Sequence, residues 1–391
     1  MKKTVTALTT LIISAAAALT LAGCGSIYNR EYVEIKDYVN QNTSTDETET
    51  VTVKNIIELE NYIRNMVSDG EESGLIRFSE EYSGDASEDM ASACWKVRTT
   101  DALCAYCVDN ISYELRSIVA ENEAQLHITY SGASVPVEEV ERLQYASEAD
   151  DVLSRAIGEG KQRVAVLINM STSTAEVMEA KADGIYLDNP ALCPVEPTVN
   201  VNVYSGNNLQ RLYEFRLNYG VNEETLDKMR QELESVRPFD EAVYELDDAG
   251  RALAAMEYLV SSCVFDTEGD SDSLYDALVT RRSDSRGLAL TYKALCNDLN
   301  VDCALLTGRY GTNARTWNII TIDGNSYHVD VGACITDGPE TGFMQSDESM
   351  WSMYRWDVSA APECHGPLTY YEAVSQSSQP VYTVTGEESG T

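Results

Sequence analysis

Three stretches of sequence decide the fold of the C-terminal part of the chain. They are S-L-Y-D-A-L-V-T-R-R-S-D-S-R-G-L-A-L-T-Y-K-A-L-C-N-D-L (273–299), A-R-T-W-N-I-I-T-I-D-G (314–324) and S-Y-H-V-D (326–330). In the first, large apolar residues recur at intervals of three and four, the spacing of one buried helical face. These residues are Leu288, Tyr292, Leu295 and Leu299. The second is rich in β-branched residues and ends in Asp-Gly, a hairpin signal. The stretches therefore predict a helix followed by two antiparallel strands.

Several residues on these predicted elements lie at positions that are typical of a catalytic site. Ser285 lies where the helix begins, beside unpaired backbone N–H groups and the positive end of the helix dipole. Enzymes place a reactive thiolate at such a position, because both features lower a thiol pKa. Gly287 leaves room for another backbone to come close. Antiparallel pairing of the strands brings Arg315 near Asp330, like a catalytic base and its orienting carboxylate, although an arginine cannot act as the base.

These stretches resemble the transglutaminase-like, papain-type superfamily in its bacterial cell-surface form. The matching residues are Tyr275, Ala277, Leu278, Gly287, Ala289, Trp317, Asn318, Tyr327, His328, Val329 and Asp330. The resemblance implies an α+β fold. It places the family's nucleophilic cysteine on Ser285, its catalytic histidine on Arg315 and its aspartate on Asp330.

The two replaced residues decide the expected chemistry. In the family a thiolate attacks an acyl carbon while an imidazole shuttles the proton. Ser285 needs a neighbouring base to become nucleophilic, and the guanidinium of Arg315 stays protonated. We therefore expect a catalytically degenerate domain, a pseudoenzyme. Two alternatives stay open: an active peptidase or acyltransferase that uses Ser285 with a base from elsewhere in the chain, and a purely structural envelope protein.

A substitute base could come from the three histidines of the chain, His127, His328 and His365. The resemblance places His328 beside the family's own catalytic histidine, so we interpret it as structural. His365, in the sequence C-H-G-P, could fold back over Ser285. Cys296 lies on the same predicted helix as Ser285 but far from its start, so we expect it in the core.

Arg315 has two predicted roles. The first is a bidentate ion pair with Asp330, which satisfies a carboxylate otherwise left unpaired. In the second, Arg315 anchors a ligand carboxylate, such as a peptide C-terminus, in a cleft. The expected cleft residues are Tyr275, Gly287, Trp317, Asn318, Tyr327 and Trp356, with Trp317 or Tyr275 providing apolar contact. The expected ligand is a peptide, a cell-wall fragment or a protein partner. We expect no cofactor and no metal ion.

The N-terminal sequence predicts export. Residues 1–23 read as a signal peptide with a basic start and an apolar run. Leu-Ala-Gly-Cys at 21–24 resembles a bacterial lipoprotein box, which implies that Cys24 is lipidated and anchors the protein to the membrane on its extracytoplasmic side. Residues 24–50 read as a polar tether and residues 375–391 as a disordered tail.

Two small α+β modules are predicted between the tether and the C-terminal domain, at 51–135 and 136–221. In each, the order is a helix, a strand, helical segments and two strands, and the second module opens with a helix expected over about 137–157. We expect them to act as spacers, with an independent binding role as the alternative. The transglutaminase-like domain is predicted at 222–374.

The amino-acid composition restricts the classes of partner that the protein is expected to bind. The formal net charge of −36 disfavours nucleic acid and anionic lipid surfaces as partners. The 43% hydrophobic content suffices for real cores. Of the ten cysteines, nine are left once Cys24 is lipidated. Cys104-x-x-Cys107 has neither a second pair nor a nearby histidine, so neither redox chemistry nor a metal site is expected there.

Overall fold

The computed structural model describes residues 50–376, except 119–120, 207–208 and 268–270. The predicted signal peptide, Cys24 and nearly all of the tether lie outside these residues, as do residues 377–391 of the predicted tail. The described residues belong to one compact unit. Within them, no helix combines the length and the apolar character needed to span a bilayer.

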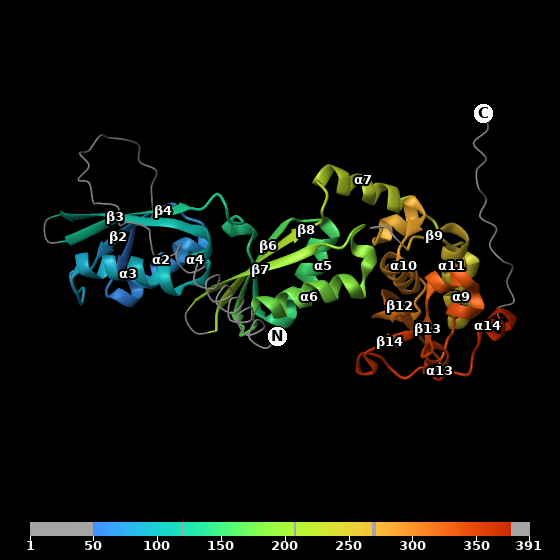
Figure 1. Cartoon of the computed structure of the whole chain (residues 1–391). Coiled ribbons are helices and arrows are strands. Elements are labelled where there is room, and N and C mark those ends of the chain that lie inside the picture. Colours follow the sequence, from blue (N-terminus) through green and yellow to red (C-terminus); the bar gives the residue numbers. More distant parts are fainter. Residues whose placement is uncertain (1–49, 119–120, 207–208, 268–270, 377–391) are drawn as a thin grey trace, which may run out of the picture. The chain divides into compact units, whose positions relative to one another are not determined.

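The first module is a four-stranded sheet with helices on one side (Figure 1). Its elements are β1 (Thr50–Val53), α2 (Ile56–Asp69), β2 (Ser73–Phe78), α3 (Ala86–Thr100), α4 (Ala102–Cys107), β3 (Val108–Ile118) and β4 (Glu121–Tyr130). The strand order is β1-β2-β4-β3. β1 runs parallel to β2, and the other neighbours are antiparallel. Leu59 and Ile63 of α2 and Met90 of α3 are fully buried in its core.

The second module repeats this topology. Its elements are η1 (Val137–Glu139), β5 (Glu141–Tyr145), η2 (Ala146–Glu148), α5 (Ala149–Glu159), β6 (Arg163–Met170), α6 (Ala175–Asp188), η3 (Pro190–Leu192), β7 (Thr198–Ser205) and β8 (Arg211–Asn218). The order β5-β6-β8-β7 has the same parallel first pair. Gly70 and Gly160 end the corresponding helices α2 and α5 with φ of 73° and 67°, a left-handed conformation that glycine adopts without strain.

The first strand of each module was missed by the sequence analysis. The helix expected over 137–157 is wrong, because β5 and two short 3-10 turns precede α5. β5 is an edge strand whose residues, E-R-L-Q-Y, are all at least partly exposed, so it lacks the alternation of buried and exposed positions that marks a strand in sequence. β1 is likewise at the edge of its sheet.

The C-terminal domain combines helices with an antiparallel sheet, whereas the sheet of each module contains a parallel pair of strands. Its elements are α7 (Glu223–Glu234), α8 (Glu241–Tyr244), α9 (Asp248–Ser262), β9 (Val264–Phe265), the π-helical η4 (Asp276–Thr280), β10 (Arg282–Ser283), α10 (Ser285–Asp298), β11 (Asp302–Tyr310), β12 (Asn313–Ile322), β13 (Asn325–Val329), α11 (Val331–Asp337), α12 (Pro339–Gly342), α13 (Asp347–Met350), β14 (Tyr354–Trp356), η5 (Val358–Ala360) and α14 (Tyr370–Gln376). The sheet order β13-β12-β11-β14 is antiparallel throughout. The chain is therefore α+β, as predicted.

The predicted helix and hairpin are present at the expected positions. α10 begins at Ser285, and β12 and β13 are joined by Asp323 and Gly324. Both turn residues have positive φ, 51° and 77°, as a tight two-residue hairpin requires. Along β12, Ile320 packs into the core shared with α9 and α10, whereas Trp317 and Ile319 pack into a separate cluster on the other side of the sheet.

Gly308 on β11 allows this second cluster to form. A Cβ added at Gly308 would lie 2.3 Å from the carbonyl oxygen of Arg355 on β14 and 2.7 Å from the Trp317 ring. The neighbouring strand and the indole therefore both approach the backbone where a side chain would stand.

Gly308→Ala is expected to destabilise the protein by about 1–3 kcal/mol, because backbone and a buried ring must move to make room. Gly184→Ala is the matched control: it lies inside α6 with no atom within 4 Å of the added Cβ, so a gain of up to about 1 kcal/mol is expected. Urea unfolding measures both. Equal stability of the two variants would contradict this packing.

Candidate functional site

Ser285 lies in the first turn of α10, but backbone N–H groups at this helix N-terminus already have a hydrogen-bond partner. The Asp284 carboxylate caps the helix, accepting hydrogen bonds from the backbone N–H groups of Arg286 and Gly287 at 2.8 and 2.9 Å. Ser285 Oγ accepts a hydrogen bond of 3.3 Å from Thr316 N on β12. A carboxylate at the terminus competes with any negative charge that develops on residue 285. The position of Ser285 is as predicted, and its surroundings do not activate it.

Gly287 lies where α10 passes close to the preceding segment. An added Cβ would lie 2.2 Å from Ser283 Oγ and 2.9 Å from both the carbonyl carbon of Asp272 and the carbonyl oxygen of Ser273. The glycine therefore permits a close approach of backbone, as the sequence indicated. It is buried and offers no ligand surface.

The Arg315 guanidinium forks onto the Asp330 carboxylate. Arg315 Nε donates to Oδ2 at 2.7 Å and Nη2 donates to Oδ1 at 2.6 Å. Each carboxylate oxygen accepts one more hydrogen bond: Oδ2 from the Tyr354 hydroxyl at 2.7 Å, and Oδ1 from Ala333 N at 3.0 Å. Asp330 is thus fully hydrogen-bonded, and no imidazole takes part in its bonds.

The guanidinium is enclosed as well as paired. Its carbon lies 4.5 Å from the centre of the Phe265 ring and 5.9 Å from that of Tyr310, within reach of cation–π attraction. The Arg315 side chain is 10% exposed. Burial opposes its charge, but the hydrogen bonds and charge of Asp330 prevail and raise the pKa of Arg315. The fork that a ligand carboxylate would need is occupied by Asp330, which argues against the ligand-anchor role of Arg315.

His328 uses both ring nitrogens in the domain core. Trp317 Nε1–H donates to Nδ1 at 3.0 Å, and Nε2 lies 2.8 Å from Asp347 Oδ1. Because an indole N–H can only donate, the proton of the neutral imidazole is on Nε2 and is donated to Asp347. Burial lowers the pKa of His328, although Asp347 partly offsets this effect. His328 is structural, as interpreted from the sequence.

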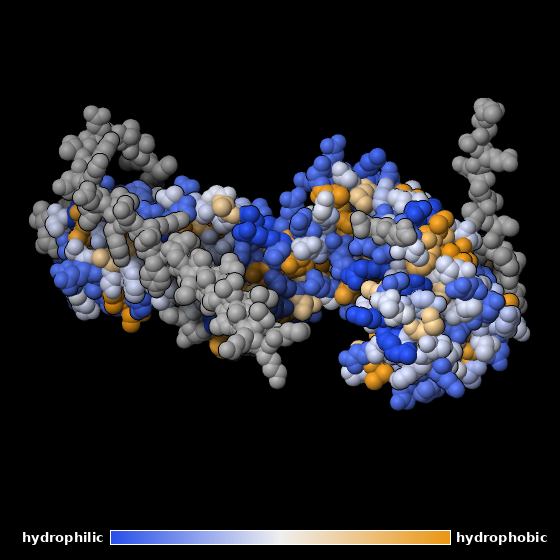
Figure 2. Space-filling model, viewed as in Figure 1, coloured by the Kyte–Doolittle hydropathy of each residue, from blue (hydrophilic) through white to orange (hydrophobic). Residues whose placement is uncertain are grey.

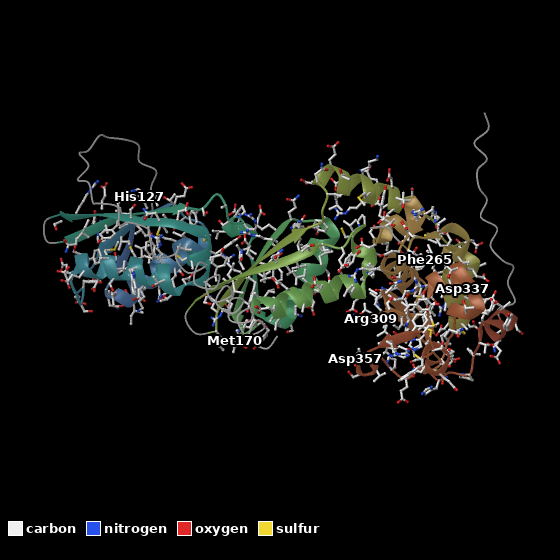
Figure 3. All side chains as sticks on the ribbon, in the orientation of Figure 1. His127, Met170, Phe265, Arg309, Asp337 and Asp357 are labelled. Atoms are coloured by element: carbon white, nitrogen blue, oxygen red, sulfur yellow. The ribbon has the colours of Figure 1, made fainter. Side chains whose placement is uncertain are left out.

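Among the described residues, no other candidate side chain hydrogen-bonds to Ser285. The His365 side chain is 64% exposed, and its Nε2 lies 3.9 Å from Asp347 Oδ2 and 3.7 Å from Glu363 Oε2. His127 belongs to β4 of the first module (Figure 3). Cys296 is fully buried in α10, and burial raises the pKa of its thiol well above the ordinary value. Among the described residues, the hydrogen bond that Ser285 Oγ makes is with a backbone amide, not with an imidazole.

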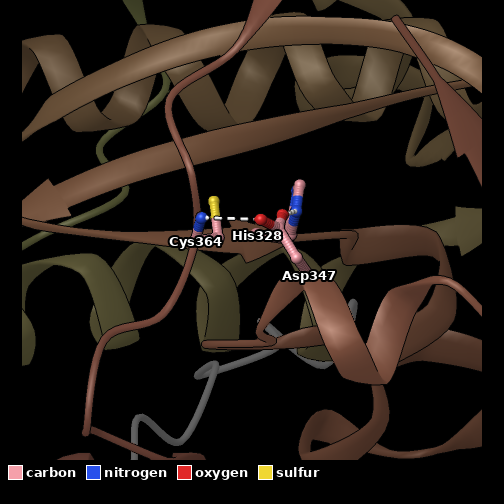
Figure 4. A group of neighbouring side chains, drawn as sticks. All are labelled: His328, Asp347 and Cys364. Atoms are coloured by element: carbon pink, nitrogen blue, oxygen red, sulfur yellow. Dashed lines mark hydrogen bonds and ion pairs between the residues drawn. The ribbon is translucent and has the colours of Figure 1, made fainter. Parts of the chain in front are cut away.

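One group of side chains has the composition of a metal site (Figure 4). His328, Asp347 and Cys364 bring one ligand atom each within 4.8 Å of one another. A metal on His328 Nε2 would require the proton on Nδ1, which faces the Trp317 N–H. Burial and the charge of Asp347 raise the pKa of Cys364 to about 12, which disfavours the thiolate that a metal binds. Asp347 instead accepts a hydrogen bond from Cys364 N at 3.1 Å. The group therefore serves as a hydrogen-bonded support for His328.

Three of the predicted cleft residues are in the core, which corrects that expectation. Trp317, Asn318 and Tyr327 are only 1%, 0% and 1% exposed. Asn318 Nδ2 donates to the carbonyl oxygen of Ala289 on α10, and Leu368 N donates to the Tyr327 hydroxyl. Their match to the family pattern therefore reflects packing of the sheet rather than contact with a ligand.

The remaining two cleft candidates are partly exposed. The Tyr275 hydroxyl hydrogen-bonds to the Glu232 carboxylate of α7. Trp356 packs edge-to-face against Trp351, with ring centroids 5.5 Å apart. Trp351 is 52% exposed, so Trp356 adjoins an exposed aromatic side chain.

The nine described cysteines are unpaired and buried. In the C-x-x-C sequence, burial is the main cause that raises the pKa of Cys107 to about 12 and that of Cys104 further. These thiols are therefore protonated at neutral pH and do not have the low pKa of redox-active pairs.

The sequence analysis missed four residues that shape the site: Phe265, Asp284, Asp347 and Tyr354. Of these four residues, only Asp284 could have been predicted from the sequence, since an aspartate directly before an apolar periodic stretch is a preferred N-cap. Tyr354 and Asp347 reach the site from a segment that follows Asp330 in the chain and has no clear periodicity.

Comparison with known proteins gives little beyond this geometry. No family model and no curated protein matches the chain. Among solved structures it is similar to a protein described as a TGase (10% identity, 50% of this chain, 60% of that chain, TM-score 0.22). It is also similar to a candidate cysteine protease from Cytophaga hutchinsonii (14% identity, 34% of this chain, 62% of that chain, TM-score 0.19). A third similar structure is that of menin with its binding site for the Mixed Lineage Leukemia protein (17% identity, 28% of this chain, 26% of that chain, TM-score 0.19). The chain spans less than two thirds of each, and such TM-scores are too low to establish a shared fold.

Arg315→Met is expected to cost about 3–5 kcal/mol of unfolding free energy, because it leaves the buried Asp330 carboxylate without its counter-charge. Arg309→Met on the same hairpin is the matched control, since Arg309 is exposed, and a change within about 0.5 kcal/mol is expected. Urea unfolding at pH 7 measures both. A loss below about 1 kcal/mol for Arg315→Met would show that the ion pair is not a main constraint.

Stability is expected to fall in mild acid through His328. Its pKa is lowered in the folded protein, so on acidification the unfolded chain takes up the proton first, from about pH 6.5 downward. This contribution is intact above that pH and is lost as the pH falls toward the folded-state pKa, at up to about 1.4 kcal/mol per pH unit.

Urea unfolding of wild type and His328→Gln between pH 7.5 and 5.5 tests this expectation. The variant is expected to lose less stability on acidification than wild type. His365→Gln, at an exposed histidine, is the control and is expected to keep the wild-type slope. Identical slopes for wild type and His328→Gln would refute the assignment.

Proposed function

We propose that this protein is an extracytoplasmic lipoprotein whose C-terminal transglutaminase-like domain binds a ligand without catalysing a reaction on it. The observation that carries the proposal is the bidentate ion pair between Arg315 and Asp330. Acyl transfer of the papain type needs an imidazole oriented by that carboxylate. Here the four hydrogen bonds that the Asp330 carboxylate accepts from described residues come from Arg315, Tyr354 and Ala333, and a guanidinium cannot accept a proton.

The state of Ser285 supports the same proposal. A serine hydroxyl is a weak nucleophile unless a base removes its proton. Ser285 Oγ accepts a hydrogen bond from Thr316 N, and the Asp284 carboxylate occupies the helix terminus that would otherwise stabilise an oxyanion. The domain thus keeps the helix N-terminus and adjacent strand of such a site but has replaced the groups that perform the chemistry.

The ligand we propose is a peptide, a cell-wall fragment or a protein partner. The location rests on the sequence alone, through the signal-like residues 1–23 and the lipidation motif ending at Cys24. The two repeated modules would then hold the binding domain away from the membrane surface. Their buried positions form ordinary cores, which fits a spacer role.

The wild-type protein is expected to show no hydrolysis of peptide amides and no acyl transfer to amines above the background of Ser285→Ala. The physical reason is that no base lies within hydrogen-bond reach of Ser285 among the described residues. Fluorogenic peptide amides and amine incorporation, followed over hours from pH 6 to 9, measure both reactions.

Ser359→Ala, at an exposed serine of the same domain, is the matched control, and a papain-type protease serves as the positive control. Turnover that is present in wild type and Ser359→Ala but absent in Ser285→Ala would reject the proposal and establish a serine enzyme.

A further inference from the structure

An exposed group of aromatic and apolar side chains lies at the edge of the C-terminal sheet, where β11 meets β14. It consists of Tyr310, Trp351, Met353 and Trp356, and we call it the aromatic surface. The first three are 37%, 52% and 48% exposed, and Trp356 is partly exposed. Hydrophilic residues dominate the visible face of the molecule, with scattered hydrophobic residues between them (Figure 2). Tyr, Trp and Met are residue types enriched in binding interfaces.

The aromatic surface is held in place by the core beneath it. Trp356 stacks edge-to-face on the buried Trp317 and on His328, with ring centroids 6.0 and 4.9 Å apart. Tyr310 lies opposite Tyr354 across the strands, with their rings 4.9 Å apart. These rings need little ordering when a ligand arrives, which lowers the entropic cost of binding.

The loop that carries Trp351 and Met353 is tied to the β11–β12 hairpin. Gly311 N donates to the carbonyl oxygen of Met353 at 2.9 Å. The Trp351 ring lies 5.5 Å from that of Trp356. The four members of the aromatic surface therefore belong to one continuous structure.

Charge around the aromatic surface favours a cationic ligand. Arg309 and Arg355 pair with each other in register and alternate with Tyr310 and Tyr354, so their side chains leave the strands on the opposite face of the sheet. The Arg355 guanidinium nevertheless donates to the carbonyl oxygen of Trp351 at 2.5 Å, so one cation lies beside the loop that carries Trp351. Arg315, on the aromatic face, is neutralised by Asp330. Residues 345–365 contain four acidic side chains, Asp347, Glu348, Asp357 and Glu363, and one arginine.

Asp357 adjoins Trp356 and stays ionised. It is exposed, and hydrogen bonds from the Ser359 hydroxyl and backbone N–H lower its pKa. Figure 3 shows that Asp357 and Arg309 both belong to the C-terminal domain. An ionised carboxylate thus lies next in sequence to an aromatic ring whose face attracts cations.

We propose that the aromatic surface docks a lysine- or arginine-bearing peptide segment of a partner protein, with the cationic groups lying on the rings of Trp351 and Trp356. This inference rests on the proposed function, because it names the ligand class of the same domain. Ring faces attract cations, and the net charge of −36 steers cationic partners while repelling anionic ones. A second copy of the chain carries the same negative charge, which opposes self-association here. A neutral glycan would gain nothing from the charge.

The test uses the purified full chain and a fluorescent hexalysine peptide, with a hexaglutamate peptide and a neutral N-acetylglucosamine hexasaccharide as comparison probes. Fluorescence anisotropy at low salt is expected to show binding of hexalysine alone. Trp351→Ala is expected to weaken it by about 5- to 30-fold through the lost cation–π contact. Met353→Ala provides a second exposed variant. Trp95→Ala, at an exposed tryptophan of the first module, is the matched control and should bind like wild type.

Several results would overturn the inference. They are equal hexalysine binding by wild type and Trp351→Ala, preference for the hexasaccharide or hexaglutamate, and affinity that does not fall when salt is raised several-fold. Trp351-dependent dimerisation in sedimentation would replace the peptide by a second copy. Ser285-dependent turnover in the same samples would reject the proposed function itself, whereas no turnover without Trp351-dependent binding would reject this inference alone.

Discussion

A buried carboxylate must have its charge and its hydrogen-bonding capacity satisfied, and much of the C-terminal domain is arranged around that need at Asp330. The side chain is 1% exposed and lies where β13 gives way to α11. Arg315 reaches it from β12, Tyr354 from β14 and Ala333 from α11. Residues of β12, β14 and the first turn of α11 are therefore fixed to one point. The pair is part of the construction of the domain, because removing either charge leaves the other unpaired in a largely buried site.

The same interaction is the reason why we propose that this site performs no acyl transfer. A carboxylate that orients an imidazole polarises a group able to gain and lose a proton near neutral pH. With a guanidinium in that place, the carboxylate is neutralised and the proton has no acceptor. Ser285 keeps its position on α10, yet its neighbours are a backbone amide and the Asp284 cap. The binding function that we propose needs only that the scaffold stay folded, and exposed aromatic side chains near β14 are available for it.

Residues that act through local pattern were predictable from sequence, whereas residues that act through long-range packing were not. The periodic apolar face of α10 and the Asp323-Gly324 turn fixed the helix and hairpin, and antiparallel pairing then brought Arg315 to Asp330. The edge strand β5 gave no alternation of buried and exposed positions, and β1, T-V-T-V, alternates over only four residues, so both strands were missed. Trp317 and Tyr327 were expected at a cleft because the resemblance named them, but a sequence match does not distinguish a buried side chain from a ligand contact.

The most direct measurement of the central claim is the reactivity of Ser285 itself. The full chain is incubated with a fluorophosphonate, which forms a covalent adduct with a serine that has an effective general base, and the adduct is located by mass spectrometry. The account predicts no adduct at Ser285 over hours, under conditions in which a serine hydrolase reacts completely. Stoichiometric labelling of Ser285, lost in Ser285→Ala, would contradict it and would mean that a base reaches the hydroxyl after all.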